Sequence, residues 1–316
     1  MPWDNTQKIA ILRDRATMLA KSRAFFSERN VLEVDCPILS PAAAIDAHID
    51  LITARFAGEK SYYLHSSPEY GMKRLLADGI GDIYQLSHVF RDNECSPKHN
   101  PEFTMTEWYR LGMTFQDLME ETLDYVRLFV GDLPHTIITY REALKKYADI
   151  DYVNSTENDL ISYLQKHQIK TYAGIESEGK DALLNIILGI FVEPFLGADG
   201  LCALAYYPST QAALAQTAQH QDETVAERFE VYYKGVELAN GYHELAEPHE
   251  QRKRFQEANV ERLKLNKESL PIDEDFLKAL EKGLPDCCGV AVGFDRLMML
   301  RHNVQDISNV IPIPWI

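Results

Sequence analysis

The segment of residues 90–109, FRDNECSPKHNPEFTMTEWY, combines an arginine, a polar loop and a strand-like run of alternating side chains. Alternate positions of a strand share one face, so Phe103, Glu107 and Tyr109 would line a single surface. Arg91 lies across the loop, and its planar guanidinium group suits phosphate because it donates two parallel hydrogen bonds. Such a surface could hold a purine, a phosphate and a cationic amine together. The alternative is a surface hairpin with a charged tip.

A second group of carboxylates lies in residues 228–244, RFEVYYKGVELANGYHE. If residues 234–235 form a two-residue turn, Tyr232 faces position 237, and Glu230 and Glu237 project from the same side. Two carboxylates held close together repel each other unless a cation lies between them. Mg²⁺ is commonly bound by one or two carboxylates plus substrate phosphates. The pattern predicts a magnesium site, and the alternative is a pair of exposed strand residues.

The same segment carries Asn240, Tyr242 and Glu244 at alternate positions. In a regular strand these three side chains would lie on the opposite face from Glu237. A β-bulge near residues 239–241 would turn both sets toward one site, and the glycine in that stretch favours such a bulge.

The rest of the chain must supply the elements that position these groups. Ser67 suits a helix N-cap, Pro68 the first helical position and Glu69 the first helical turn. The remaining patterns predict helices over residues 7–30, 68–77, 115–130 and 248–265. They also predict an extended segment over 49–64, a mainly helical region over about 140–200 and a buried strand over 203–207.

The composition is that of an ordinary globular chain with an acidic surface. With 316 residues, 46% of them hydrophobic and 25% charged, the chain can bury a sizeable core. The net charge is −16, and no basic cluster typical of a nucleic-acid binder stands out. Neither a signal-peptide run nor an apolar stretch long enough for a bilayer is evident, so we expect a cytoplasmic protein without membrane association. The five cysteines lack CxxC spacing, which argues against zinc and disulfides, and Cys287 and Cys288 should pack as reduced thiols.

Three segments, in order, resemble the signature motifs of the class II aminoacyl-tRNA synthetases. Residues 26–37 (FSERNVLEVDCP) resemble motif 1, residues 90–109 motif 2, and residues 289–296 (GVAVGFDR) motif 3. The HNPEFTM run of motif 2 is similar to the lysyl branch. The resemblance implies one α+β class II catalytic domain, an antiparallel sheet flanked by helices, over residues 1–316 with a helical insertion at about 140–200. Motif 1 also implies a homodimer.

The resemblance assigns roles on the nucleotide side of the site. Arg91 would contact the α-phosphate of ATP and the reacting carboxylate, Arg296 would contact the γ-phosphate, and these two arginines would carry catalysis. Phe103 would stack on adenine, and Glu230 and Glu237 would bind the Mg²⁺ ion on ATP. The further ATP contacts that the resemblance implies are Asn93, His99, Asn100, Glu237, Leu238 and Gly293.

The resemblance also assigns an amino-acid pocket. Glu244 would receive the ε-ammonium group of lysine, with Glu107 and Tyr109 beside it, and Glu69 would contact the other amino group. A dry pocket that ends in negative charge and a hydroxyl group is what recognition of lysine requires. The implied lysine-binding set is Ser67, Pro68, Glu69, Glu107, Tyr109, Asn240, Tyr242, Glu244 and Ala291.

Two positions depart from the family pattern. Asn93 stands where the pattern has glutamate, and Glu94 follows it, while Lys98 stands where lysyl enzymes usually have arginine. Asn93 still accepts a hydrogen bond but has lost the charge, and Lys98 keeps the charge but loses the planar fork.

Within the lysyl branch, the chain is similar to truncated paralogues that lack the anticodon-binding OB domain and act on elongation factor P. Their SPEY, HNPEFTM-EWY and ELANG-HEL signatures are present here, apart from substitutions such as Tyr242. This implies a ligase that forms an amide bond between lysine, preferably (R)-β-lysine, and the ε-amine of a lysine on elongation factor P. ATP would be converted to AMP and pyrophosphate, and no stable tRNA binding is expected.

Ala291 supports the β-isomer, because lysyl-tRNA synthetases usually have glycine there, and an added methyl group would reshape the pocket. Three alternatives remain open. They are a truncated enzyme that charges tRNA, an enzyme that uses another amine acceptor, and a non-catalytic paralogue that binds nucleotide and regulates another process.

Overall fold

The computed structural model describes residues 5–42, 44–56, 58, 60–171, 174–175 and 178–315. The chain groups into two compact units, one of Met1–Asp132 with Glu244–Ile316 and the other of Leu133–His243. The expectation of one domain over residues 1–316 remains a prediction. The helical insertion expected at about 140–200 lies in the second unit.

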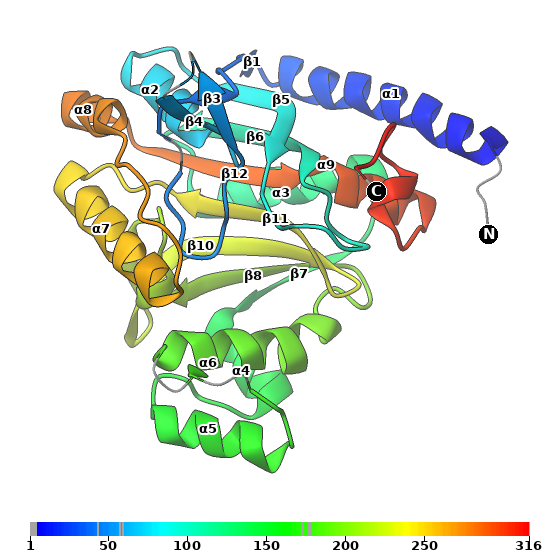
Figure 1. Cartoon of the computed structure of the whole chain (residues 1–316). Helices are drawn as coiled ribbons and strands as arrows, with labels where there is room; N and C mark the ends of the chain where they lie inside the picture. The colour runs from blue at the N-terminus through cyan, green and yellow to red at the C-terminus, as the bar shows by residue number, and fades with distance from the viewer. Residues whose placement is uncertain are drawn as a thin grey trace. The chain divides into compact units, whose positions relative to one another are not determined.

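The first unit is built on a sheet with the strand order β1-β5-β6-β12 (Figure 1). Its strands are β1 (Leu32–Glu33), β5 (Ile83–Phe90), β6 (Glu102–Leu111) and β12 (Cys287–Gly293). The last three are antiparallel, and the short β1 lies parallel to β5. The antiparallel sheet is therefore confirmed, with one parallel pair at its edge. A small antiparallel sheet contains β2 (Leu39–Ser40), β4 (Lys60–Leu64) and β3 (Thr53–Phe56).

The helical elements of the first unit are α1 (Asn5–Ser27), α2 (Glu69–Ala77), α3 (Phe115–Val130), α7 (Pro248–Lys264), α8 (Glu274–Gly283), α9 (Phe294–His302) and the 3₁₀ turn η5 (Ile307–Asn309). The helix predicted over residues 115–130 is confirmed with the same bounds. The predicted helices at 7–30, 68–77 and 248–265 are confirmed with shifted ends, whereas α8 was not predicted.

Buried aromatic side chains form much of the core of the first unit. Phe26 of α1 stacks on Tyr84 of β5, with ring centroids 4.2 Å apart, and contacts Trp108 of β6. Tyr125 of α3 packs on the same rings, and its hydroxyl group hydrogen-bonds to Thr106. Full burial of such a side chain contributes about 1.5–3 kcal/mol. These contacts make β6 a rigid support for the candidate site residues that it carries.

The second unit has the strand order β11-β10-β8-β7, with β9 paired to β10. The elements are β7 (His135–Thr139), α4 (Tyr140–Ala148), α5 (Glu157–Lys166), α6 (Lys180–Ile187), the π-helical turn η2 (Leu188–Val192), η3 (Glu193–Phe195), β8 (Leu201–Pro208), η4 (Ser209–Gln211), β9 (Thr217–His220), β10 (Glu223–Tyr233) and β11 (Val236–His243). β7 lies parallel to β8, and the other pairs are antiparallel. Figure 1 shows α4, α5 and α6 gathered beside β7 and β8, where Leu144, Leu160 and Leu204 are part of one buried cluster. The predicted helical region and the strand at 203–207 are confirmed, and β7 was not predicted.

Capping signals explain where three helices begin. Thr139 accepts a hydrogen bond from the backbone of Glu142, whose carboxylate accepts one from the Thr139 N–H, and Thr156 and Asp159 form the same capping box. Thr114 caps α3 through its side chain. Each cap satisfies backbone donors that have no partner inside the helix.

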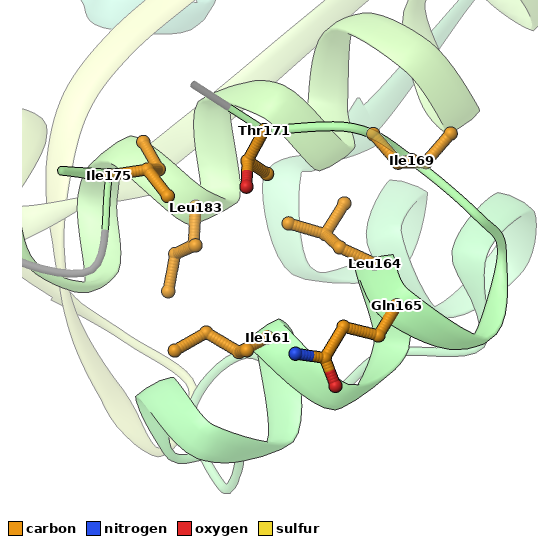
Figure 2. A pocket seen from close by; sticks show the side chains of 7 residues that line it. All are labelled: Ile161, Leu164, Gln165, Ile169, Thr171, Ile175 and Leu183. Atoms are coloured by element: carbon orange, nitrogen blue, oxygen red, sulfur yellow. The ribbon is translucent and has the colours of Figure 1, made fainter. Parts of the chain in front are cut away.

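A small cavity lies among the helical segments of the second unit (Figure 2). The side chains that line it are Ile161, Leu164, Gln165, Ile169, Thr171, Ile175 and Leu183. Its volume of about 30 Å³ has room for about one water molecule. This cavity is therefore too small for a nucleotide or an amino acid.

The five cysteines are free thiols, and Cys287 and Cys288 are buried, as predicted. No helix within the described part of the chain combines the length and the apolar character that crossing a bilayer requires.

Candidate active site

Three carboxylates that are distant in sequence are buried in the same region of the first unit. Glu69, Glu107 and Glu244 are 9%, 3% and 2% exposed. The Ser67 hydroxyl group donates to Glu107 Oε2 at 2.7 Å, and the Tyr109 hydroxyl group donates to Glu107 Oε1 at 2.6 Å. Each oxygen of Glu107 therefore has a donor, and five predicted lysine-binding residues lie in one cluster.

The helix start beside this cluster differs from the prediction by one residue. α2 begins at Glu69 with Pro68 at the cap position, whereas the sequence suggested Ser67 as the cap. The Ser67 hydroxyl group still accepts a hydrogen bond from the Glu69 N–H at 3.0 Å. Because proline has no N–H group, this contact satisfies the first backbone donor of the helix.

A buried lysine balances part of the negative charge. Lys73, one helical turn after Glu69, is 0% exposed. Its Nζ lies 2.5 Å from Glu69 Oε1 and 2.6 Å from Glu244 Oε2. Burial disfavours its charge, yet the two carboxylates raise the pKa of Lys73 above its ordinary value, so it remains an ammonium group. Lys73 was not among the predicted site residues, although its i, i+4 spacing from Glu69 is readable in the sequence.

Burial also shifts the acids of this cluster. It raises the pKa of Glu107 to about 7, and the charge of Glu69 adds to the shift. It raises the pKa of Glu244 to about 8, although Lys73 opposes the shift. A group of three carboxylates with one ammonium group can take up a further cation, because each added positive charge relieves their repulsion.

Strand β12 places small residues opposite this cluster. Gly289 pairs with Tyr109, and Ala291 pairs with Glu107. A Cβ atom on Gly289 would lie 2.3 Å from Tyr109 Cε1 and 2.5 Å from Glu244 Oε1, so glycine is required beneath these side chains. Gly289 was not predicted as a site residue. A glycine inside a strand is the signal that could have found it.

The loop between β5 and β6 arranges the motif 2 arginine. Arg91 Nη1 lies 3.7 Å from Glu94 Oε1, and the guanidinium carbon lies 5.1 Å from the centroid of the Phe103 ring. The Arg91 Nε atom is buried without a hydrogen-bond partner. Asn93 has a φ angle of 61°, a left-handed conformation in which asparagine is enriched. Glu94 thus supplies the carboxylate near Arg91 that the family pattern has at position 93, while Lys98 is exposed.

His99 connects this loop to the motif 3 arginine. Arg296 Nη2 donates to His99 Nε2 at 2.9 Å, and His99 Nδ1 lies 2.8 Å from the Ser96 hydroxyl oxygen. Burial and the charge of Arg296 lower the pKa of His99, so the ring is neutral and accepts the hydrogen bond. The structure therefore brings together two of the predicted ATP-binding residues.

Two other predicted ATP contacts have different surroundings. The Asn100 amide donates to Glu102 O at 2.6 Å and accepts from the Trp315 N–H at 3.1 Å, so it anchors the C-terminal segment. An added Cβ on Gly293 would lie 3.7 Å from Arg296 Cδ, which is an ordinary contact. The fold itself does not require glycine at 293, which leaves the expected close approach of a nucleotide as a reason for it.

A buried ion pair supports the start of motif 3. Arg15 of α1 contacts Asp295, the residue before Arg296, and donates to Thr104 Oγ1 at 2.7 Å. Asp295 Oδ2 accepts from the Thr104 N–H at 2.7 Å. This network links α1, β6 and α9, and it was not predicted because its partners are far apart in the sequence.

The second unit carries the other predicted residues on the hairpin of β10 and β11. Lys234 and Gly235 form the predicted turn, with φ angles of 51° and 68°, as a type I′ turn requires. Tyr232 pairs with Glu237, also as predicted.

The predicted bulge exists, one residue before the predicted stretch. The register shifts between Val231 and Tyr232 and leaves Leu238 as the extra residue, whereas the sequence suggested residues 239–241. Gly241 pairs regularly, and the tight turn fixes only the pairs nearest to it, so the irregularity follows directly after them. Both polar sets therefore share one face, on which the pairs are Arg228 with Tyr242, Glu230 with Asn240, and Tyr232 with Glu237.

Glu230 on this face already has two donors. Arg228 Nη2 donates to its Oε1 and the Tyr232 hydroxyl group to its Oε2, both at 2.6 Å. Each carboxylate oxygen has a second lone pair, so these contacts leave capacity for a cation. Asn240 Oδ1 is buried without a hydrogen-bond partner, and Glu237 is half-buried. These oxygen donors are of the kind that Mg²⁺ prefers, so the residues fit the ion.

Within the described ranges, no group of three or more His, Cys, Asp or Glu side chains could hold a metal ion. A magnesium site here would therefore depend on the two glutamates and on substrate phosphates. The side chain of Leu238, predicted to contact ATP, is 2% exposed and belongs to the core.

Comparison with known proteins identifies the family. A family model described as tRNA synthetases class II (D, K and N) matches residues 2–316. The chain belongs to this family. The class II synthetase fold predicted from the three motifs is therefore confirmed.

Curated relatives of this class II chain agree with the narrower resemblance. The elongation factor P–(R)-β-lysine ligase of Haemophilus influenzae strain PittGG is 43% identical over 98% of this chain and 96% of the relative. The enzyme of the same name from Klebsiella pneumoniae subsp. pneumoniae is 42% identical over 98% of this chain and 96% of the relative. The one from Yersinia enterocolitica serotype O:8 is 41% identical over 99% of this chain and 97% of the relative. The predicted resemblance to the ligases that act on elongation factor P is confirmed.

Proposed function

We propose that this chain is a ligase that uses ATP to activate lysine, preferably (R)-β-lysine, and transfers it to the ε-amino group of a lysine on elongation factor P. The observation that carries the proposal is the buried cluster of Glu69, Glu107 and Glu244, whose negative charge suits a substrate with two amino groups. The ligases named above share 41–43% identity with the chain, which supports the choice of acceptor.

The first step would join the substrate carboxylate to the α-phosphorus of ATP. A carboxylate oxygen attacks in line, the bond from the α-phosphorus to the bridging oxygen breaks, and pyrophosphate leaves. Little proton transfer is needed, so positioning and charge stabilisation carry the rate. We assign Arg91 to the α-phosphate and the reacting carboxylate, Arg296 to the γ-phosphate and Phe103 to adenine. The further ATP contacts proposed are Asn93, His99, Asn100, Glu237, Leu238 and Gly293.

Glu230 and Glu237 are the proposed ligands of Mg²⁺. When bound, the ion would offset phosphate charge during pyrophosphate release. The Arg228 guanidinium group orients the Glu230 carboxylate, since it holds one of its oxygens.

In the second step the acceptor amine would attack the carbonyl carbon of the adenylate. An amide bond forms between the amine nitrogen and the carbonyl carbon, and the bond from that carbon to the phosphate oxygen breaks. AMP leaves, and the amine nitrogen loses a proton. Because the acceptor is a translation factor, we propose a cytoplasmic location, and the motif 1 resemblance supports a homodimer. A net charge of −16 disfavours stable tRNA binding.

The first test is ATP–pyrophosphate exchange with α-lysine, (R)-β-lysine, ornithine and arginine. We expect the strongest exchange with a lysine isomer, and (R)-β-lysine should exceed α-lysine. Absence of exchange with all four, in folded protein that still binds ATP, would favour the regulatory paralogue. Transfer of labelled substrate to elongation factor P, beside tRNA and a free amine as acceptors, then separates the proposed ligase from the two other enzymes.

A further inference from the structure

We propose that Lys73 is a positioning residue of the amino-acid site, whose ammonium group fixes Glu69 and Glu244 and sets the pocket charge to match two ammonium groups. This inference rests on the proposed function, because it concerns how a diamino acid is recognised.

The position of Lys73 is fixed by its helix and by its burial. It follows Glu69 by one turn of α2, so the helix determines the distance between their side chains. At 0% exposure its side chain does not contact solvent, and its ammonium group lies within 2.6 Å of an oxygen of each partner. A charge held in this way is a fixed part of the pocket.

Lys73 engages one oxygen of Glu244 and leaves the other facing a different direction. The contact is through Oε2, whereas Oε1 is the atom that lies over Gly289, next to the Tyr109 ring. The carboxylate is thus oriented with one edge toward the helix and the other toward β12. Without the ammonium group, Glu244 and Glu69 would repel each other and lose this orientation.

The charges of the cluster match the substrate class. Ionised Glu69, Glu107 and Glu244 carry three negative charges and Lys73 one positive charge, so the pocket can accept two more positive charges. A lysine isomer supplies them through its two amino groups. A monoamino acid would leave an uncompensated buried carboxylate, which is costly.

The groups that face Lys73 set how this balance responds to pH. They are Glu69 on α2, Glu107 on β6, Glu244, and the Cys287 thiol on β12, and the Tyr109 hydroxyl group donates to Glu107. In a variant with a neutral residue at position 73, Glu107 and Glu244 would hold a proton to a higher pH, because Lys73 lowers the pKa of both, and an incoming diamine must displace that proton.

The test compares the neutral variants K73M and K73Q with K73R and with K253M. Lys253 is the matched control, because it also lies between two glutamates on a helix but is exposed. For each variant, kcat/KM for lysine and (R)-β-lysine, KM for ATP and the pH profile from 6 to 9.5 are measured by pyrophosphate exchange. Thermal melting identifies the folded variants. If only one of K73M and K73Q folds, that variant alone is enough for the test.

We expect the neutral variants to lose about 30-fold or more in kcat/KM for the amino acid, since a buried charge pair is broken. The KM for ATP should change by less than about twofold, and the acidic limb of the profile should move up by about one pH unit. In K73R the acidic limb of the pH profile should stay at the wild-type pH, and K253M should match the wild type in all three measurements.

Wild-type values in both neutral variants would overturn the inference. An equal loss of kcat/KM for ATP and for the amino acid, with the acidic limb of the pH profile unchanged, would also overturn it, because that result indicates a purely structural role. If the wild type shows no exchange, the proposed function fails, and calorimetric binding of 1,5-diaminopentane then decides the inference. Equal binding by wild type and K73M would overturn it, and weaker binding by K73M would support it.

Discussion

The two units bury glutamates beside a cation in different ways. In the first unit Glu69 and Glu244 share the ammonium group of Lys73, and Glu107 lies beside them. In the second unit Glu230 accepts hydrogen bonds from the guanidinium group of Arg228 and from the Tyr232 hydroxyl group.

The difference in charge balance suggests different ligands. The first cluster keeps an excess of carboxylates, and burial raises two of their pKa values, so it suits the amino groups of an organic substrate. On the β10–β11 face one glutamate is balanced, and Glu237 and the Asn240 carbonyl oxygen are hard donors that suit a divalent cation.

The largest effect should come from Glu244→Ala. We expect a loss of about 2–5 kcal/mol in amino-acid binding, much of it because the substrate ammonium group loses its carboxylate and Lys73 loses one of its two. KM and kcat/KM for lysine in pyrophosphate exchange provide the measurement, with the exposed Glu281→Ala as control. Wild-type affinity for the amino acid would contradict the assignment of Glu244.

Glu230→Gln and Glu237→Gln test the other side of the comparison. We expect half-maximal exchange to need about 10–100-fold more Mg²⁺, while KM for lysine stays close to the wild-type value. Titration of Mg²⁺ at fixed ATP measures this, with the exposed Glu257→Gln as control. A changed lysine KM with an unchanged Mg²⁺ requirement would reverse the two assignments.

Gly289→Ala sharpens the description of the first cluster. The added methyl group would overlap Tyr109 and Glu244, so we expect a loss of about 1–3 kcal/mol in the free energy of unfolding and a higher KM for the amino acid. Denaturant unfolding measures the first quantity. Gly189→Ala is the control, because an added Cβ there meets nothing within 4 Å. Equal effects of the two substitutions would show that the close packing at Gly289 is unimportant.

The smallest effects concern pH, and stability and binding should change in opposite directions. Because the pKa values of Glu107 and Glu244 are raised in the folded chain, to about 7 and about 8, their stabilising contribution is present below 4.5 and is lost as the pH rises through 7–8. Denaturant unfolding of the ligand-free protein should show stability that decreases from pH 6 to about 8 and then levels off.

Amino-acid affinity should increase over the same range. Below about pH 7 the diamine must displace protons, so kcat/KM for lysine should fall by about tenfold per pH unit for each proton. Parallel changes of stability and kcat/KM, or a flat profile for both, would contradict the shifted pKa values of this cluster.

Much of the fold could be predicted because its signals are local. The bounds of α3 were predicted from hydrophobic spacing that ends before Asp132 and Pro134, and the turn at 234–235 was predicted from a Lys-Gly pair. The missed elements had weaker local signals. β7 (His135–Thr139) is a short strand that pairs in parallel with β8, so its partner is more than sixty residues away.

The sequence by itself determined which chemical groups the protein contains and which family it belongs to. The order of the three motifs, the alternation in β6 and the paired glutamates of the hairpin depend only on residues close in the chain. These features predicted the fold class, and the alternation in β6 predicted Glu107 as a site residue. Ser67 and Glu69 were predicted as site residues from the SPEY resemblance.

The tertiary structure alone decided how the charges are balanced. That Lys73 contacts Glu244, that Arg15 holds Asp295 and that Gly289 lies beneath Tyr109 all depend on residues brought together from distant segments. The position of the bulge at Leu238 likewise depends on the pairing of two whole strands. Burial and neighbouring charge set the pKa of a carboxylate, and neither exists until the chain has folded.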